Sequence, residues 1–326
     1  MPLDLSDTLV VGITSTALFD MTESDSVFQA KYKEDKSTAV AQYREYMLQH
    51  EDEPLAPGTG MPLVRALLAL NQFQREGARP LVEVVVMSRN SPETGLRVLK
   101  NIRRLELPIT RHAFTGGESV TAYLDAFDVD LFLTTKASDA QKVTDAGTCA
   151  VALVKAPPSD TAPIPEGQVR IAFDADAVLF DESSELIHKA EGLGSFHRNE
   201  DARQDQPMSE GPYAQFLRKL SRLQSRLPFG VEFSPVHIAI VTARNAPAEM
   251  RVIKTLRHWN VYANEMFFLG GVEKAKVLRA FRPHIFFDDQ DAHLEPAAKH
   301  VPSAKVPYKT SSPLNVALRA VEPESK

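Results

Sequence analysis

Short apolar segments alternate with longer segments of helical periodicity along most of the chain. Residues 169–174, 236–242 and 283–288 are apolar runs of strand length, and each ends in a polar side chain. Continuous apolar runs of this length are typical of strands that are buried on both faces of a parallel sheet. Because helical segments separate them, the pattern predicts strand–helix–strand units and therefore an α/β fold.

The pattern occurs twice along the chain. Residues 96–135 align with residues 250–289 without gaps, at a spacing of 154 residues. Apolar and glycine positions coincide in this alignment, as in the pairing of Phe132 with Phe286. Both copies have the order strand, amphipathic helix, strand, helix, strand. We therefore predict that one α/β unit is duplicated.

The repeat and the local composition divide the chain into two halves. Residues 156–167 contain four prolines, which is typical of a linker. We expect a first half at 1–155, a second half at 168–308 and a tail at 309–326. A polar, helix-rich insertion of about residues 182–232 separates the first two strands of the second half.

The composition is that of a globular protein and argues against several classes. The 326 residues are 43% hydrophobic and 25% charged, and the net charge of −6 argues against general nucleic-acid binding. No apolar run approaches the roughly 20 residues that span a bilayer. The N-terminal residues lack the features of a signal peptide. The single cysteine, Cys149, lies in an apolar segment and predicts a packed thiol, so we expect a reducing, cytoplasmic setting.

Polar residues suited to catalysis follow the apolar runs. Asp174 and Asp176 end the first run, Thr242 ends the second, and Asp288 and Asp289 end the third. The carboxyl ends of parallel strands are where open α/β sheets bind ligands. Crowded carboxylates favour a hard cation such as Mg²⁺. One aspartate of the first pair could attack phosphorus while the other moves a proton.

The order Asp-x-Asp, Thr, Lys, Asp-Asp resembles the four motifs of the haloacid dehalogenase superfamily of phosphotransferases. The lysine of this order is Lys274, which follows a glycine pair. In more detail, residues 173–180, 241–244 and 282–290 are similar to the cytosolic 5′-nucleotidase I family. Further similar segments lie upstream, so that the resemblance covers roughly residues 8–308.

This resemblance implies a haloacid dehalogenase-like Rossmannoid parallel sheet, duplicated, in which the insertion of the second copy forms a helical cap over the active site. It implies that Asp174 is the nucleophile and forms an aspartyl-phosphate. Asp176 would protonate the leaving oxygen and then activate water, and Lys274 would supply a fixed positive charge. Ala175 stands where that family more commonly has glycine.

The resemblance also implies how phosphate and metal are bound. Thr242 and the backbone N–H of Ala243, at the start of a helix, would bind phosphate. Arg244 is either a further phosphate ligand or a surface charge. Mg²⁺ would be bound by Asp174, the main-chain carbonyl of Asp176 and a carboxylate of Asp288 or Asp289.

The expected enzyme is therefore a Mg²⁺-dependent 5′-nucleotidase that hydrolyses nucleoside 5′-monophosphates, with AMP favoured. Its partner is a small nucleotide, and neither nucleic acid nor membrane is expected. Two alternatives stay open. One is a phosphatase of another small phosphoester, and the other is a nucleotide-binding regulator in which catalysis is vestigial.

The first half lacks the proposed reacting residues. The aligned pairs are Ile13 or Thr14 with Asp174, Ser15 with Asp176, Met87 with Thr242, Val120 with Lys274, and Thr134 and Thr135 with Asp288 and Asp289. Glycine and apolar positions persist while the reacting residues are replaced. We expect a catalytically silent copy that supplies either an effector site or a surface for a homo-oligomer.

Overall fold

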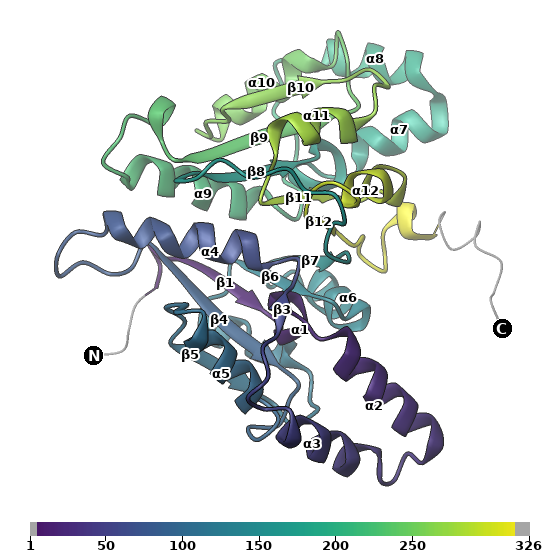
Figure 1. Cartoon of the computed structure of the whole chain (residues 1–326). Helices are drawn as coiled ribbons and strands as arrows, with labels where there is room; N and C mark the ends of the chain where they lie inside the picture. Colours follow the sequence, from purple (N-terminus) through teal and green to yellow (C-terminus); the bar gives the residue numbers. More distant parts are fainter. Residues whose placement is uncertain (1–4, 317–326) are drawn as a thin grey trace. The chain divides into compact units, whose positions relative to one another are not determined.

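The computed structural model describes residues 5–316, and the chain forms two compact units, Met1–Thr135 and Lys136–Lys326 (Figure 1). Both units are built on parallel strands with helices around them. The α/β class expected from the sequence is confirmed, and the arrangement is compatible with a Rossmann-like fold. No helix among residues 5–316 is long and apolar enough to cross a membrane.

Unit 1 contains a parallel sheet in the order β6-β1-β4-β5. Its strands are β1 (Leu9–Ile13), β4 (Val82–Ser88), β5 (Arg111–Phe114) and β6 (Leu131–Thr134). A second sheet pairs β2 (Phe19–Asp20) with β3 (Ala56–Pro57). The helices are α1 (Ser15–Leu18), α2 (Thr22–Glu34), α3 (Ala39–Gln49), α4 (Met61–Ala69) and α5 (Leu96–Arg104), with short turns η1 (Leu70–Phe73), η2 (Val120–Tyr123) and η3 (Asp125–Phe127).

Unit 2 contains strands in the order β10-β9-β8-β11-β12-β7. They are β7 (Ala150–Val154), β8 (Val169–Phe173), β9 (Val236–Thr242), β10 (Glu265–Phe268), β11 (Ile285–Asp288) and β12 (Ser303–Lys305). All these pairings are parallel except that of β12 with β7. The helices are α6 (Ala137–Ala146), α7 (Ser183–Glu191), α8 (Leu193–Ala202), α9 (Ala214–Arg226), α10 (Glu249–His258), α11 (Lys274–Phe281) and α12 (Asp291–Ala298), with turns η4 (Ala175–Leu179) and η5 (Val231–Phe233).

The strand order of unit 2 places a switch point at β8. The next strand along the chain, β9, pairs on one side of β8, and β11 pairs on the other. In open parallel sheets, ligands bind at the carboxyl ends of strands where the order reverses in this way. Phe173 at the end of β8 is fully buried and stacks on Phe287 of β11, with ring centroids 5.5 Å apart. This packing anchors the residues that follow both strands.

The strands of the two units match the sequence repeat in position and length. β4, β5 and β6 lie 154 residues before β9, β10 and β11, and the paired strands have equal lengths. β1 precedes β4 in its sheet as β8 precedes β9, and both strands have five residues, so β1 corresponds to β8 by order and length, at a spacing of 160 residues (169 − 9). The units therefore share an order of local elements.

The segment expected as an insertion has two different parts. Phe180 pairs with Glu210 in an antiparallel bridge, and the Gly211 N–H donates to the Leu179 carbonyl at 2.8 Å. These contacts close the base of a loop that contains α7 and α8. The following helix, α9, buries Phe216 against the ring of Phe173, with centroids 6.2 Å apart, and so belongs to the core.

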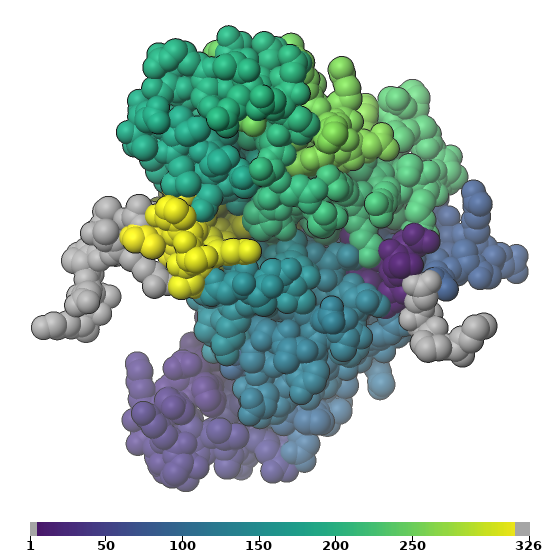
Figure 2. Space-filling view, turned by 180° about the vertical axis from the view of Figure 1, so that it is seen from behind, coloured from purple at the N-terminus to yellow at the C-terminus, as the bar shows by residue number. Residues whose placement is uncertain are grey.

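The segment expected as a tail begins with specific contacts. The Thr310 N–H donates to Asp145 Oδ1 at 2.6 Å, and Leu314 is buried. Figure 2 shows this end of the described chain in yellow. Residues 317–326 of the expected tail lie outside the described residues. Cys149 lies just before β7 and is half-buried, so the packed thiol expected from the sequence is only partly enclosed.

Candidate active site

Asp174 lies directly after β8, at the switch point of the sheet. Its backbone N–H donates to the Phe287 carbonyl at 2.8 Å, which continues the pairing of β8 with β11. Its Oδ1 accepts the Ala175 N–H at 2.7 Å. The residue is 4% exposed. The local backbone therefore fixes the carboxylate at the edge of the sheet.

Lys274 bridges two of the predicted carboxylates. It is the first residue of α11, and its Nζ lies 2.9 Å from Asp174 Oδ1 and 2.7 Å from Asp288 Oδ2. Burial acts to lower the pKa of Lys274, but Asp174 and Asp288 outweigh burial and raise it. The lysine is therefore a fixed cation between two carboxylates. Lys276, the other lysine near the glycine pair, is exposed.

The two bridged carboxyl groups have different electrostatic environments. Burial raises the pKa of Asp174 to about 7, opposed by Lys274 and reinforced by Asp288. Burial also acts to raise the pKa of Asp288, but Lys274 and His293 outweigh it and lower that pKa. Asp288 thus keeps its negative charge more readily than Asp174 does. Any cation bound beside Asp174 would favour the ionised form of that group.

Asp289 points to a different partner. Its Oδ2 accepts a hydrogen bond from the Tyr308 hydroxyl. Its Oδ1 is buried and has no hydrogen-bond partner among the described residues. Burial, followed by the charges of Asp288 and Asp174, raises the pKa of Asp289 well above its ordinary value. Of the paired aspartates, Asp288 is therefore the one that faces Asp174 through Lys274.

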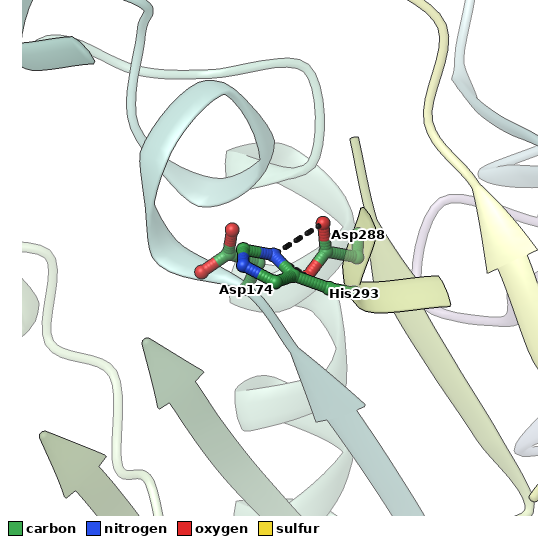
Figure 3. Close-up of side chains that lie close together, drawn as sticks. All are labelled: Asp174, Asp288 and His293. Atoms are coloured by element: carbon green, nitrogen blue, oxygen red, sulfur yellow. Dashed lines mark hydrogen bonds and ion pairs between the residues drawn. The ribbon is translucent and has the colours of Figure 1, made fainter. Parts of the chain in front are cut away.

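A group that could hold a metal ion lies at the same edge. Ligand atoms of Asp174, Asp288 and His293 all lie within 4.8 Å of one another (Figure 3). His293 comes from the first turn of α12, and its Nδ1 lies 3.2 Å from Asp288 Oδ2. The carboxylates of Asp174 and Asp288 are hard oxygen donors of the kind that a divalent cation prefers. The residues present therefore fit a metal.

His293 was not predicted from the sequence. It stands five residues after Asp288, beyond the apolar strand, and belongs to none of the four motifs. The signal that could have found it is the start of a helix directly after a strand that ends in a carboxylate. Side chains of that first turn return to the strand end.

Asp176 forms an ion pair with Arg244. Arg244 Nε donates to Asp176 Oδ2 at 2.8 Å, and Nη2 donates to Oδ1 at 2.6 Å. Two parallel bonds of this kind fix both the position and the plane of a carboxylate. Arg244 is 3% exposed, so its expected alternative as a surface charge is wrong.

The residues that end β9 occupy the neighbouring strand tip. Thr242 is buried, and its Oγ1 accepts the Arg244 N–H at 3.2 Å. Ala243 is exposed. The expectation that Ala243 opens a helix is wrong, because α10 begins only at Glu249, after a turn. A bound phosphate could therefore meet the Ala243 N–H in a loop, without a helix N-terminus.

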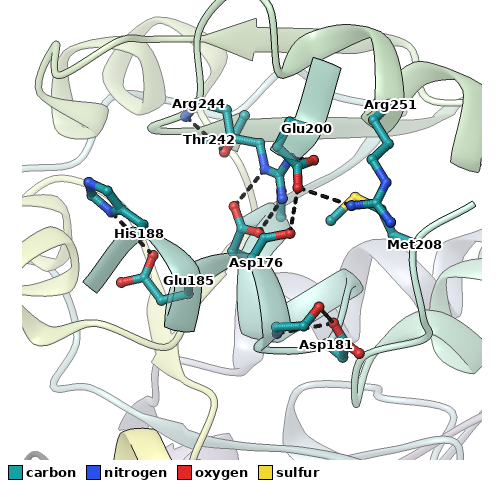
Figure 4. Close-up of polar contacts among 12 residues, drawn as sticks. Asp176, Asp181, Glu185, His188, Glu200, Met208, Thr242, Arg244 and Arg251 are labelled. Carbon is teal, nitrogen blue, oxygen red and sulfur yellow. Dashed lines mark hydrogen bonds and ion pairs between the residues drawn. The ribbon is translucent and has the colours of Figure 1, made fainter. Parts of the chain in front are cut away.

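A buried carboxylate of α8 completes the arrangement around Arg244. Glu200 Oε2 accepts from Arg244 Nη1 at 2.6 Å, and its Oε1 accepts from Arg251 Nη1 at 3.0 Å (Figure 4). Ser184 of α7 also donates to Oε1, at 2.9 Å. Glu200 was not predicted from the sequence, because it lies in a polar helix with no motif around it.

The strand ends of unit 1 change two of the residue pairs that the sequence alignment predicts between the two halves. β4 ends at Ser88 as β9 ends at Thr242, and both hydroxyls accept the N–H of the residue two positions on, at 3.2 Å. Ser88, and not Met87, therefore corresponds to Thr242. Likewise Thr16, two residues past Thr14, corresponds to Asp176 in place of Ser15. Unit 1 therefore keeps a hydroxyl at the position of Thr242, whereas the carboxylates of unit 2 are replaced.

Comparison with known proteins agrees with the family resemblance of the sequence. A family model for 5′-nucleotidase matches residues 1–313. The human cytosolic 5′-nucleotidase 1B is 32% identical over 297 residues, which cover 89% of this chain and 47% of that protein. The chain thus spans about half the length of this curated relative. No solved structure gives a significant match. The chain belongs to the cytosolic 5′-nucleotidase I family.

Proposed function

We propose that this chain is a Mg²⁺-dependent phosphoric monoester hydrolase that converts nucleoside 5′-monophosphates, AMP above all, to nucleoside and phosphate. The observation that carries the proposal is the bridge of Lys274 between Asp174 and Asp288 at the switch point of the sheet. The membership in a 5′-nucleotidase family supports the reaction class.

In the proposed first step, a carboxylate oxygen of Asp174 attacks phosphorus, and the bond between phosphorus and the 5′-oxygen breaks. Asp176 gives a proton to that oxygen, so a neutral nucleoside leaves. In the second step, Asp176 takes a proton from water while the water oxygen attacks the phosphorus of the aspartyl-phosphate. Inorganic phosphate forms and the Asp174 carboxylate is restored.

Asp174 and Asp288 would hold the metal, together with the main-chain carbonyl of Asp176 and, through its free Oδ1, Asp289. When bound, the ion neutralises charge between the anionic nucleophile and the anionic substrate. Mg²⁺ prefers oxygen ligands, whereas imidazole suits transition metals. We therefore infer that His293 orients Asp288, from which it lies 3.2 Å away, and does not ligate Mg²⁺ itself.

Positive charge and hydroxyl donors next to the nucleophile would bind the phosphate. Lys274 contacts Asp174 directly and can reach an oxygen of the transferring group. The hydroxyl of Thr242 and the N–H of Ala243 lie at the adjacent strand end. Arg244 is engaged by Asp176 and Glu200, so its part in phosphate binding would be indirect.

The finer architecture forms part of the proposal. We infer that the two units descend from one duplicated haloacid dehalogenase-like unit, since β4, β5 and β6 recur as β9, β10 and β11 at a spacing of 154 residues. We infer that α7 and α8 form the cap, since their loop closes beside Asp176. The silent first copy would supply an effector site or an oligomer surface. A cytoplasmic setting is inferred from the name of the relative.

The test is release of inorganic phosphate from a panel of nucleoside monophosphates and sugar phosphates, with Mg²⁺ and after chelation. We expect release to be fastest with AMP and to stop when the metal is removed. Preference for a sugar phosphate would favour the alternative phosphatase. Nucleotide binding without any release would favour the regulator.

A further inference from the structure

A chain of four buried or nearly buried charged groups leads from Asp176 through Glu200 of α8 to Arg251 of α10. Asp176 pairs with Arg244, Arg244 with Glu200, and Glu200 with Arg251, at donor–acceptor distances of 2.6–3.0 Å. Glu200 has no exposed surface, and Arg244 is 3% exposed. Two carboxylates and two guanidinium groups balance in charge (Figure 4).

The chain of ion pairs joins elements that are distant in sequence. Asp176 lies after β8, Arg244 after β9, Arg251 on α10, and Glu200 on α8. Two further contacts attach α8 to the loop after β9. The Arg244 guanidinium lies 5.1 Å from the centre of the Phe196 ring, and His197 Nε2 lies 2.9 Å from Asn245 Oδ1. The position of α8 is thus coupled to the position of Arg244.

Glu200 limits what Arg244 can do. A guanidinium can donate hydrogen bonds to two carboxylates at once. Here Nε and Nη2 of Arg244 donate to Asp176, and Nη1 donates to Glu200. Without Glu200, the arginine could rotate toward the anionic substrate and release Asp176. Burial of Glu200 makes this restraint stiff, because a buried charge stays with its partners.

We propose that Glu200 is a positioning residue of the reaction, which acts through Arg244 to orient Asp176 for proton transfer. The inference rests on the proposed function, in which Asp176 serves the leaving oxygen. Docking of α8 then completes the site, because the helix brings Glu200. The α7–α8 loop therefore contributes to the proton transfer as well as covering the site.

Two substrates with different leaving groups can distinguish a residue that positions the acid from a residue that only supports the fold. A nucleoside 5′-oxygen leaves as a strong base and needs a proton. A p-nitrophenolate leaves readily without one. For both substrates, kcat/KM reports events up to transfer of the phosphoryl group to Asp174, the step in which the leaving group departs. Loss of a well-placed acid should therefore lower kcat/KM for AMP far more than for p-nitrophenyl phosphate.

The experiment compares Glu200→Gln with Asp201→Asn, an exposed neighbour on the same helix, in the full-length enzyme with Mg²⁺. General acid catalysis contributes about 10²–10⁴-fold. We expect Glu200→Gln to lower the ratio of kcat/KM values, AMP over p-nitrophenyl phosphate, by about tenfold or more. Asp201→Asn should leave the ratio unchanged. An equal loss for both substrates, or no loss, would overturn the proposal.

Asp176→Asn distinguishes this inference from the proposed function. If Asp176→Asn shows the leaving-group effect and Glu200→Gln does not, only the inference fails. If Asp176→Asn slows both substrates equally, the acid role in the proposed function fails as well. Should Glu200→Gln not fold, Glu200→Asp keeps the charge but shortens the reach to Arg244. The same selective loss is then expected, and a ratio equal to that of the parent enzyme would refute the role.

Discussion

At the scale of single residues, the site is a set of buried charged groups, each of which forms a specific ion pair or hydrogen bond. Lys274 forms ion pairs with Asp174 and Asp288, while Arg244 forms an ion pair with Asp176. Removing one member of a buried pair leaves an unpaired charge, which costs more than losing a surface pair. Substitutions at these residues should therefore change stability as well as activity, and the two effects can be separated.

Asp174→Asn should remove turnover. An amide oxygen is a poor nucleophile, so phosphate release from AMP should fall by about 10³-fold or more. The fold should persist, because asparagine has nearly the same shape and leaves no buried carboxylate. Phosphate release and circular dichroism check both points. Turnover equal to that of the parent protein would remove Asp174 from the nucleophile role.

Lys274→Met should destabilise the metal-free protein at neutral pH. Asp174 and Asp288 would then face each other without their shared cation, at an expected cost of about 3–5 kcal/mol. Lys276→Met is the matched control, since Lys276 is exposed and should change stability by less than about 0.5 kcal/mol. Urea unfolding of both variants without metal measures the difference. Equal midpoints would show that the bridge contributes nothing to stability.

At the scale of elements, the base of the α7–α8 loop determines where Glu200 lies. Gly211 passes so close to the backbone of Phe180 that an added Cβ would lie 2.3 Å from the Phe180 carbonyl oxygen. No side chain fits at that distance from backbone. The contact holds both ends of the loop together and thereby fixes the approach of α8 to Arg244.

Gly211→Ala should disrupt the contacts at the base of the α7–α8 loop. We expect a loss of about 1–3 kcal/mol in the free energy of unfolding, because the backbone must move apart. In Gly194→Ala, within α8, the new methyl group meets only Arg198 Nη1, at 3.5 Å. That control should gain up to about 1 kcal/mol from helix propensity. Thermal unfolding separates the two, and similar changes in both variants would contradict the steric argument.

At the scale of the whole molecule, a buried histidine outside the site also makes stability depend on pH. His284 precedes β11 and is 7% exposed. Its Nδ1 accepts the Arg170 N–H at 3.0 Å, so the ring is neutral. Burial lowers the pKa of His284 to about 4. The unfolded chain therefore binds a proton at higher pH than the folded chain does.

Folding stability should consequently fall as the pH is lowered from about 6.5 to about 4. The contribution of His284 over this window is on the order of 3 kcal/mol and is present in full above the unfolded pKa. In His284→Gln, this part of the pH dependence should disappear. The control His258→Gln alters an exposed histidine and should keep the slope. Chemical unfolding between pH 4 and 7 tests this, and equal slopes in all three proteins would refute it.

Much of the site could be predicted from the sequence because its residues directly follow strands. Asp174, Thr242 and Asp288 lie at the carboxyl ends of neighbouring parallel strands, and pairing in register brings such ends to one edge. The amino-acid pattern also determined the α/β class and the order of the strands along the chain. Local hydrophobic periodicity is enough for these features, since burial of a strand depends on its own residues.

Only the tertiary structure decided which charged group faces which. Asp176 meets Arg244 across 68 positions of sequence, and Glu200 meets it across 44. Asp289 turns to Tyr308, and His293 joins Asp288. Such pairings depend on how helices dock and where side chains point. No local pattern contains that information, because each partner's environment is created by segments far away in the chain.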